Sequence, residues 1–341
     1  MAEPINYRSP TYYELAAPPE LDWRPYRRPD YREYRRQWDE RPGMREAGAF
    51  PLHLDIDPTN RCNLSCSMCP RTYYLKEGRP DWNPEGRLGD MDFGLYRRLI
   101  EEGAQEGLKS VKLNFLGEPL LYSRLEDMVS LAAEAGLWVM INTNATLLSR
   151  EKSRRLLEAG LSDIFFSFDS PYPAEYEAVR VGAEYEKTLA NIRDFMESKE
   201  ELGKKGLQTR ASMVLPKNLA GDELEKLKAD YIKLFRDLKV AEIGFGRPTV
   251  MGLDYEKTYG LFPGFVCPDL FRRFFVFWDG PAGPCCGDWE RRLIVGDARR
   301  QSIGEIWRSP AYLELRQAHL NGRYYDLPAC RACSVPYLST N

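Results

Sequence analysis

Strand-like apolar runs alternate with helix-like stretches along most of this chain. The apolar runs lie at 52–57, 111–116, 137–142, 163–168, 209–215 and 240–245. The stretches with helical periodicity lie near 92–106, 123–135, 149–159, 184–200 and 221–238. Strands that alternate with helices of this length predict βαβ units and a parallel sheet. The pattern fits a partial barrel or a doubly wound sheet, and periodicity alone does not choose between them.

Polar turns follow the first four of these runs. In both architectures a site lies at the C-terminal ends of the strands. The turns are Asp57 to Cys69, Gly117-Glu118-Pro119, Asn142-Thr143-Asn144 and Ser167-Phe168-Asp169. Because these ends share one edge of the sheet, we expect the turns to form a common site.

Composition excludes several classes of protein. Apolar residues make up 43% of the 341 residues, and the formal net charge is −3, without the basic excess that nucleic-acid binding needs. No apolar run approaches the roughly 20 residues of a membrane span, and the N-terminus lacks the apolar core of a secretory signal. We therefore expect a soluble, cytoplasmic protein. In that setting eight cysteines indicate metal or redox chemistry rather than disulfides.

Three cysteines stand in the loop after the first strand-like run. Cys62, Cys66 and Cys69 have C-x3-C-x2-C spacing. Three thiolates leave one iron of a [4Fe–4S] cluster without a protein ligand, and that iron can bind a small molecule with amine and carboxylate groups. Zinc is the alternative, but structural zinc sites use four ligands, commonly in C-x2-C pairs.

A second group of cysteines lies in the last quarter of the chain. Cys267, Cys285, Cys330 and Cys333 can enclose a second [4Fe–4S] cluster, which leaves Cys286 over. The final C-x2-C pair suits a four-cysteine zinc site as well. Spacing alone leaves both possibilities open.

The segment TNRCNLSCSMCP closely resembles the cluster loop of radical S-adenosylmethionine (SAM) enzymes. Leu116-Gly117-Glu118-Pro119 resembles the Gly-Gly-Glu-Pro motif of that family, with Leu116 in place of the first glycine. Asn142-Thr143-Asn144 resembles its Thr-Asn-Gly segment, and Ser167-Phe168-Asp169 its Ser-Leu/Ile-Asp segment. The motifs occur in the family's order over about residues 50–250, and they imply a partial (β/α)6 TIM-type barrel.

The resemblance also implies cofactors and site residues. Cys62, Cys66 and Cys69 would hold a [4Fe–4S] cluster that cleaves bound SAM to a 5′-deoxyadenosyl radical, which abstracts a hydrogen atom from the substrate. The Gly117-Glu118-Pro119 segment would bind the SAM amino group, and Arg180 the SAM carboxylate. The complete set of implied SAM-binding residues is Met68, Gly117, Glu118, Pro119, Asn142, Asn144, Ser167, Asp169 and Arg180.

The C-terminal cysteine segment resembles the SPASM/twitch extensions of radical SAM enzymes. A full SPASM pattern has three further cysteines after the C-x2-C pair, which this sequence lacks. The resemblance therefore implies a twitch-type arrangement with one auxiliary [4Fe–4S] cluster on Cys267, Cys285, Cys330 and Cys333. Cys286 would be structural, an alternative ligand or a hydrogen-atom donor. We predict an N-terminal extension over 1–50, the barrel over 51–250 and the auxiliary domain over 251–341.

Twitch-type relatives include an aminocyclitol dehydrogenase, and this implies a substrate class. We expect a carbohydrate-like small molecule (a sugar, aminocyclitol or nucleotide sugar), with two-electron dehydrogenation preferred over epimerisation. The electron donor would be a flavodoxin or a ferredoxin. The alternative is a peptide- or protein-modifying maturase, although residues 1–50 are too short and too poor in aliphatics for a peptide-recognition domain. An iron–sulfur scaffold protein would leave the strand-end motifs unexplained.

Polar residues near the strand ends are candidates for contacts with the substrate. None is preferred from the sequence. They are Asp57, Asn114, Tyr122, Asn144, Arg210, Glu242 and Arg247. Residues 1–50, rich in Tyr, Arg and Pro, are expected to lie on the surface as an extension.

Overall fold

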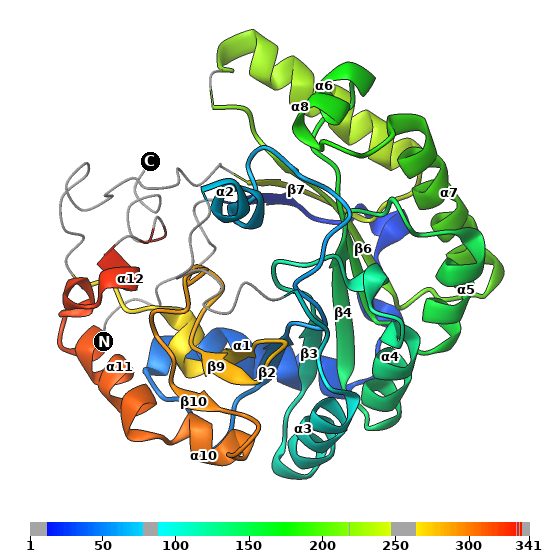
Figure 1. Cartoon of the computed structure of the whole chain (residues 1–341). Helices are drawn as coiled ribbons and strands as arrows, with labels where there is room; N and C mark the ends of the chain where they lie inside the picture. Colours follow the sequence, from blue (N-terminus) through cyan, green and yellow to red (C-terminus); the bar gives the residue numbers. More distant parts are fainter. Residues whose placement is uncertain are drawn as a thin grey trace.

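The computed structural model describes residues 12–77, 88–217, 219–246, 264–331, 333 and 335. Its centre is a curved sheet of order β1-β7-β6-β5-β4-β3-β2-β8-β9-β10, whose two ends do not meet (Figure 1). Six consecutive strands are parallel: β2 (His53–Ile56), β3 (Ser110–Leu113), β4 (Trp138–Thr143), β5 (Asp163–Ser167), β6 (Gln208–Val214) and β7 (Glu242–Gly246). The prediction of a partial barrel is therefore confirmed, and the doubly wound sheet is excluded.

Helices cover the outer side of this sheet (Figure 1). They are α3 (Phe93–Glu106), α4 (Leu125–Glu134), α5 (Arg150–Glu158), α6 (Pro173–Val179), α7 (Tyr185–Glu201) and α8 (Gly221–Asp237). Side-chain caps fix where some of them begin: the Asp92 carboxylate accepts from the Leu95 N–H at 2.8 Å, and the Ser149 hydroxyl from the Lys152 N–H at 3.2 Å.

The strands present different chemistry to the two sides of the sheet. In β4, Val139 and Ile141 are fully buried in the core beneath the helices, whereas Met140 and Asn142 on the other face are only partly buried. Burial alternates in the same way along all seven residues of β6. Because alternate side chains point to opposite faces, the inner face of the barrel is the accessible one.

Segments from both ends of the chain pair with the edges of the parallel sheet. β1 (Tyr12–Leu15) is antiparallel to β7, and β8 (Arg273–Val276) is parallel to β2. β9 (Pro281–Gly283) and β10 (Gly296–Asp297) continue the sheet as antiparallel strands. The C-terminal cysteine segment is thus joined to the strand that precedes the first cysteine loop.

The C-terminal part adds helical elements whose buried side chains continue the hydrophobic core of the sheet. Its helical elements are η4 (Pro268–Phe271), α10 (Ile303–Trp307), α11 (Pro310–Leu320), η5 (Tyr324–Asp326) and α12 (Pro328–Arg331). The Trp307 ring packs against Phe274 and Tyr312, with centroids 6.1 and 5.1 Å away. The buried Arg316 guanidinium donates to the carbonyls of Leu270 and Trp307 at 2.8 and 2.9 Å.

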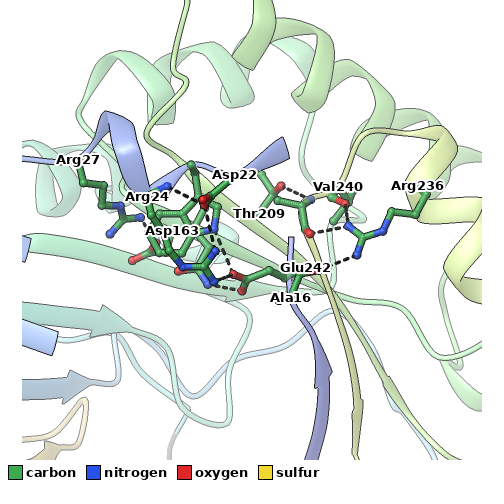
Figure 2. A network of polar contacts seen from close by, with 12 residues as sticks. Ala16, Asp22, Arg24, Arg27, Asp163, Thr209, Arg236, Val240 and Glu242 are labelled. Carbon is green, nitrogen blue, oxygen red and sulfur yellow. Dashed lines mark hydrogen bonds and ion pairs between the residues drawn. The ribbon is translucent and has the colours of Figure 1, made fainter. Parts of the chain in front are cut away.

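The N-terminal segment is more deeply packed than its composition predicts. It forms η1 (Pro19–Leu21), η2 (Arg24–Tyr26) and α1 (Asp30–Met44), with Trp23 and Tyr34 buried. Figure 2 shows Arg27 beside Asp163 and Arg24 reaching Glu242. Because Asp163 and Glu242 begin β5 and β7, this segment covers the N-terminal ends of the strands, opposite the predicted site. Aromatic rings that stack on arginines supply the apolar contact that its few aliphatic residues cannot.

None of the helices within the described ranges is long and apolar enough to span a membrane.

Candidate iron–sulfur and SAM site

The first cysteine loop connects β2 to α2 (Pro70–Glu77) and is fixed by backbone hydrogen bonds. The Ser65 N–H donates to the Val181 carbonyl at 2.9 Å, and the Ser67 N–H to the Val179 carbonyl at 3.0 Å. These bonds hold the loop against the end of α6. The backbone spacing of the three cysteines is therefore set by the fold.

The Gly117 turn lies directly against the start of this loop. A Cβ atom added at Gly117 would lie 1.8 Å from the Thr59 carbonyl oxygen and 2.8 Å from that of Arg61. The Glu118 N–H donates to the same Arg61 carbonyl at 2.7 Å. Only glycine permits this approach of two backbones, which locks the turn after β3 to the cysteine loop.

The chemistry of the three thiols suits an iron–sulfur cluster. Burial raises the pKa of Cys66 to about 11 and also raises that of Cys62, and the neighbouring thiols add to both shifts. An Arg180 Nη1 atom lies 3.9 Å from the Cys66 sulfur and favours the thiolate. A coordinated metal deprotonates such thiols outright, so mutually close, buried or half-buried thiols beside a cation fit a thiolate-bound cluster.

The Glu118 carboxylate ties together the turns after β3 and β4. One oxygen accepts from the Leu120 N–H at 3.1 Å and the Thr143 hydroxyl at 2.7 Å, and the other from the Asn144 N–H at 2.8 Å. Burial raises the pKa of Glu118, and these hydrogen bonds and Arg180 oppose the shift. Glu118 therefore stands in the predicted place, with its oxygens already engaged by the protein.

Arg180 joins the cysteine loop to the end of β5. Its Nε donates to an Asp169 carboxylate oxygen at 2.5 Å, and the other Asp169 oxygen accepts from the Val214 N–H at 2.7 Å. Asp169 and Cys66 raise the pKa of Arg180 further above its usual value, although burial opposes them. The guanidinium is a fixed positive charge beside the first thiol group.

The remaining predicted SAM-binding residues lie along the same strand ends. The side-chain amide nitrogen of Asn144, Nδ2, is 4.0 Å from the Cys62 sulfur. The Asn142 side-chain oxygen is buried without a hydrogen-bond partner in the described part of the chain. Ser167 is the last residue of β5, and Pro119 begins the short helix η3 (Pro119–Leu121). Met68 stands between two of the cysteines and packs, partly buried, against the core. The fold thus gathers the predicted turns at one edge.

The four C-terminal cysteines form a second group of mutually close thiols. Burial raises the pKa of Cys330 to about 12 and that of Cys333 to about 11, and it raises those of Cys267 and Cys285 further. Each of the other three thiols contributes to the shift of Cys285. The set therefore suits a second thiolate-bound cluster.

In neither group do three His, Cys, Asp or Glu side chains of the described chain converge on one metal ion. Thiolates of an iron–sulfur cluster bind different irons, so this convergence is not required of them.

Cys286 has different surroundings from its neighbour Cys285. Its thiol is exposed and lies 3.9 Å from an Arg273 Nη atom, while Arg273 also pairs with Asp55 on β2 at 3.3 Å and with Asp269 at 2.6 Å. Cys286 thus faces charged residues at the inner side of β2 and β8. Neither Asp55 nor Arg273 was predicted as a site residue, and Arg273 lies on β8, which follows a long interruption of the βα pattern.

The polar strand-end residues that were candidates for substrate contact do not lie together at one site. Asp57 is buried, and burial with nearby Asp279 raises its pKa to about 8 while Arg291 opposes the shift. Glu242 contacts the N-terminal segment and lies at the opposite end of the barrel from the cysteines. The Tyr122 hydroxyl donates to the Met91 carbonyl, which indicates a structural role. Arg247 lies outside the described residues.

His319 was not selected from the sequence, although it is one of only two histidines in the chain. It is buried on α11, between two of the C-terminal cysteines: its Nδ1 lies 3.3 Å from the Cys267 backbone nitrogen, and its Nε2 3.5 Å from the Cys330 sulfur.

Two family models match the segments that contain the two cysteine groups. The model of the radical SAM superfamily matches residues 56–228, and that of the SPASM iron–sulfur cluster-binding domain matches residues 267–334. A tungsten-containing aldehyde ferredoxin oxidoreductase cofactor-modifying protein of Pyrococcus furiosus is 26% identical over 328 residues, 83% of this chain and 87% of that protein. A PqqA peptide cyclase of Rhodopseudomonas palustris is 31% identical over 123 residues, which are 36% of this chain and 30% of the cyclase.

Solved structures share the fold. BtrN in complex with AdoMet and 2-DOIA has a TM-score of 0.52 at 18% identity, over 82% of this chain and 91% of BtrN. SuiB of Streptococcus suis bound to its precursor peptide SuiA has a TM-score of 0.59 at 15% identity, over 88% of this chain and 75% of SuiB. The two matched domains imply SAM and two [4Fe–4S] clusters as cofactors. This chain belongs to the radical SAM superfamily and carries a SPASM-type iron–sulfur domain after its barrel.

Proposed function

We propose that this enzyme oxidises a hydroxylated, carbohydrate-like small molecule by two electrons. The observation that carries the proposal is the polar inner face of the barrel. A sugar or aminocyclitol presents many hydroxyl groups, and a site that binds them needs hydrogen-bonding and charged side chains.

The strand register places polar side chains side by side on this face. Asn142 pairs with Phe165, which pairs with Arg210 on the next strand, so these three share one row. Asp55 pairs with Lys112 in the adjacent row. The Arg210 guanidinium lies 3.5 Å above the Phe165 ring. The two rows together thus offer an amide, an aromatic surface, a carboxylate and two cations to a hydroxylated ligand.

Lys112 is the group on this face best suited to hold a polar substrate. It makes no hydrogen bond or ion pair with any residue that the structure describes, and its side chain is only partly buried. Burial lowers the pKa of Lys112, and Asp55 opposes the shift. An ammonium group that makes no hydrogen bond or ion pair within the described part of the chain can bind a hydroxyl, phosphate or carboxylate oxygen of the substrate.

The chain also provides a short route from this face to the auxiliary thiols. Asp55 on the inner face pairs with Arg273, which contacts Cys286, the neighbour of Cys285. When bound, SAM and the first cluster would supply a hydrogen-abstracting radical, and the auxiliary cluster a one-electron acceptor. Loss of one hydrogen atom, one proton and one electron from a carbinol gives a carbonyl group, so the oxidation balances.

The test is anoxic incubation of the reconstituted enzyme with reductant, SAM and a panel of sugars, aminocyclitols and nucleotide sugars. We expect 5′-deoxyadenosine together with a product lighter by two hydrogens, and deuterium from the carbinol carbon should appear in the 5′-deoxyadenosine. Turnover with a peptide alone would reject the proposal.

A matched pair of lysine variants tests the inner face. Lys112→Met should raise the KM for the substrate and leave the binding of SAM unchanged. Lys187→Met is the control, because Lys187 is exposed on α7 and, among the described residues, forms an ion pair only with Glu184 at the surface. Equal effects of the two variants would show that Lys112 does not contact the substrate.

Cofactor modification is the second candidate, and the Pyrococcus furiosus relative favours it. The same assay with the cofactor of a tungsten-containing aldehyde ferredoxin oxidoreductase as substrate distinguishes the two.

A further inference from the structure

His319 bridges Cys267 and Cys330, two cysteines within the segment that the SPASM model matches. The side chain is 2% exposed and packs against two rings: Tyr324 stacks on it with centroids 5.8 Å apart, and Phe265 meets it edge-on at 6.1 Å. The imidazole therefore has one fixed orientation, and each ring nitrogen faces a different cysteine.

The hydrogen bond at Nδ1 determines where the ring proton lies. The Cys267 backbone N–H donates to Nδ1 at 3.3 Å, so Nδ1 carries a lone pair and no proton. An imidazole without a proton on Nδ1 carries it on Nε2. The Nε2 atom lies 3.5 Å from the Cys330 sulfur, within the distance of a hydrogen bond to sulfur. The geometry thus makes Nε2–H a donor to this sulfur.

We propose that His319 is a positioning residue that donates an N–H···S hydrogen bond to the Cys330 thiolate and thereby raises the reduction potential of the auxiliary cluster. The inference rests on Cys330 being a ligand of that cluster. A donor at a ligand sulfur withdraws negative charge from it, which stabilises the reduced, more negative cluster. His319 would then favour electron transfer toward the auxiliary cluster, as the proposed oxidation needs.

The experiment measures the potential of the auxiliary cluster alone. Full-length protein with Cys62, Cys66 and Cys69 changed to Ala is reconstituted, its iron is counted, and the remaining cluster is titrated by electron paramagnetic resonance. In this background His319→Asn keeps an acceptor near the Nδ1 position but removes the donor at Nε2, whereas His319→Gln keeps a donor near Nε2.

We expect His319→Asn to make reduction about tenfold less favourable, a fall of about 59 mV for a one-electron couple. His319→Gln should restore much of this loss. Phe265→Leu is the packing control, because it alters the contact with the ring and leaves both ring nitrogens in place, and its potential should stay unchanged.

Two results would overturn the inference, and they are distinguishable. A background protein that binds no iron would show that Cys330 is not a cluster ligand. A protein with about four irons whose potential is the same in His319→Asn and His319→Gln would retain the ligand assignment and reject the hydrogen bond.

Discussion

Gly117→Ala tests whether the turn after β3 sets the position of the first cysteine loop. The added Cβ would lie 1.8 Å from the Thr59 carbonyl oxygen, and ordinary contact begins at 3.4 Å, so one backbone must move by about 1.6 Å. Both obstructing groups are backbone carbonyls, which cannot rotate away as a flexible side chain can. A displacement of about 1 Å costs on the order of 100-fold in rate in a preorganised site. We therefore expect SAM cleavage to fall about 100-fold.

Overpacking should also destabilise the protein by about 1–3 kcal/mol. The assay measures 5′-deoxyadenosine by liquid chromatography, with iron per chain and melting temperature measured in the same samples. Gly43→Ala is the matched control, because a Cβ added there meets nothing within 4 Å. Normal SAM cleavage in Gly117→Ala would refute the reasoning, since the loop would then tolerate the displacement.

Three further perturbations test separate parts of the structure. In Asp57→Asn the enzyme loses a carboxyl group that binds its proton more tightly when folded, with a pKa of about 8 against a usual value near 3.8. The free energy of unfolding of the wild type, relative to this variant, should therefore fall as pH rises from about 4 to about 8, by at most about 1.4 kcal/mol per pH unit. Urea unfolding that depends on pH in the same way in both proteins would contradict this. Arg27→Met leaves Asp163 buried without its main cation and should lower the free energy of unfolding in urea by about 3–5 kcal/mol. The double variant Arg27→Met/Asp163→Asn should regain part of this loss, and a double-variant loss equal to the sum of the two single losses would rule out the coupling. Arg180→Lys keeps the charge but loses the planar fork beside Asp169, so the KM for SAM should rise about tenfold or more at unchanged iron content, and an unchanged KM would exclude the proposed contact with SAM.

The sequence predicted the barrel well because its signals are local. The apolar run at 163–168 and the helical periodicity near 184–200 correspond closely to β5 (Asp163–Ser167) and α7 (Tyr185–Glu201). The motif turns were also placed correctly at one edge, since parallel strands bring their C-terminal ends together. Hydrophobic periodicity and motif order therefore suffice to predict the strands and the turns that form the site.

Contacts between residues far apart in the sequence could not be predicted. Arg273 contacts Asp55, 218 positions away in the sequence, because β8 pairs with β2. Hydrophobic periodicity does not indicate which strand pairs with the free edge of β2. The contacts of Arg27 in the N-terminal segment are of the same kind: it pairs with Asp163 across 136 positions. His319 gave no motif, since its role depends on the ring stack that orients it. Side chains on the inner face could be suggested by alternation but not assigned partners.

Counting iron and sulfide per chain tests the assignment of two thiol groups to two clusters most directly. The wild type, reconstituted without oxygen, should bind about eight irons, and the protein with Cys62, Cys66 and Cys69 changed to Ala should bind about four. The complementary variant, with Cys267, Cys285, Cys330 and Cys333 changed to Ala, should also bind about four and still cleave SAM. About four irons in the wild type, or none in the first variant, would contradict the account.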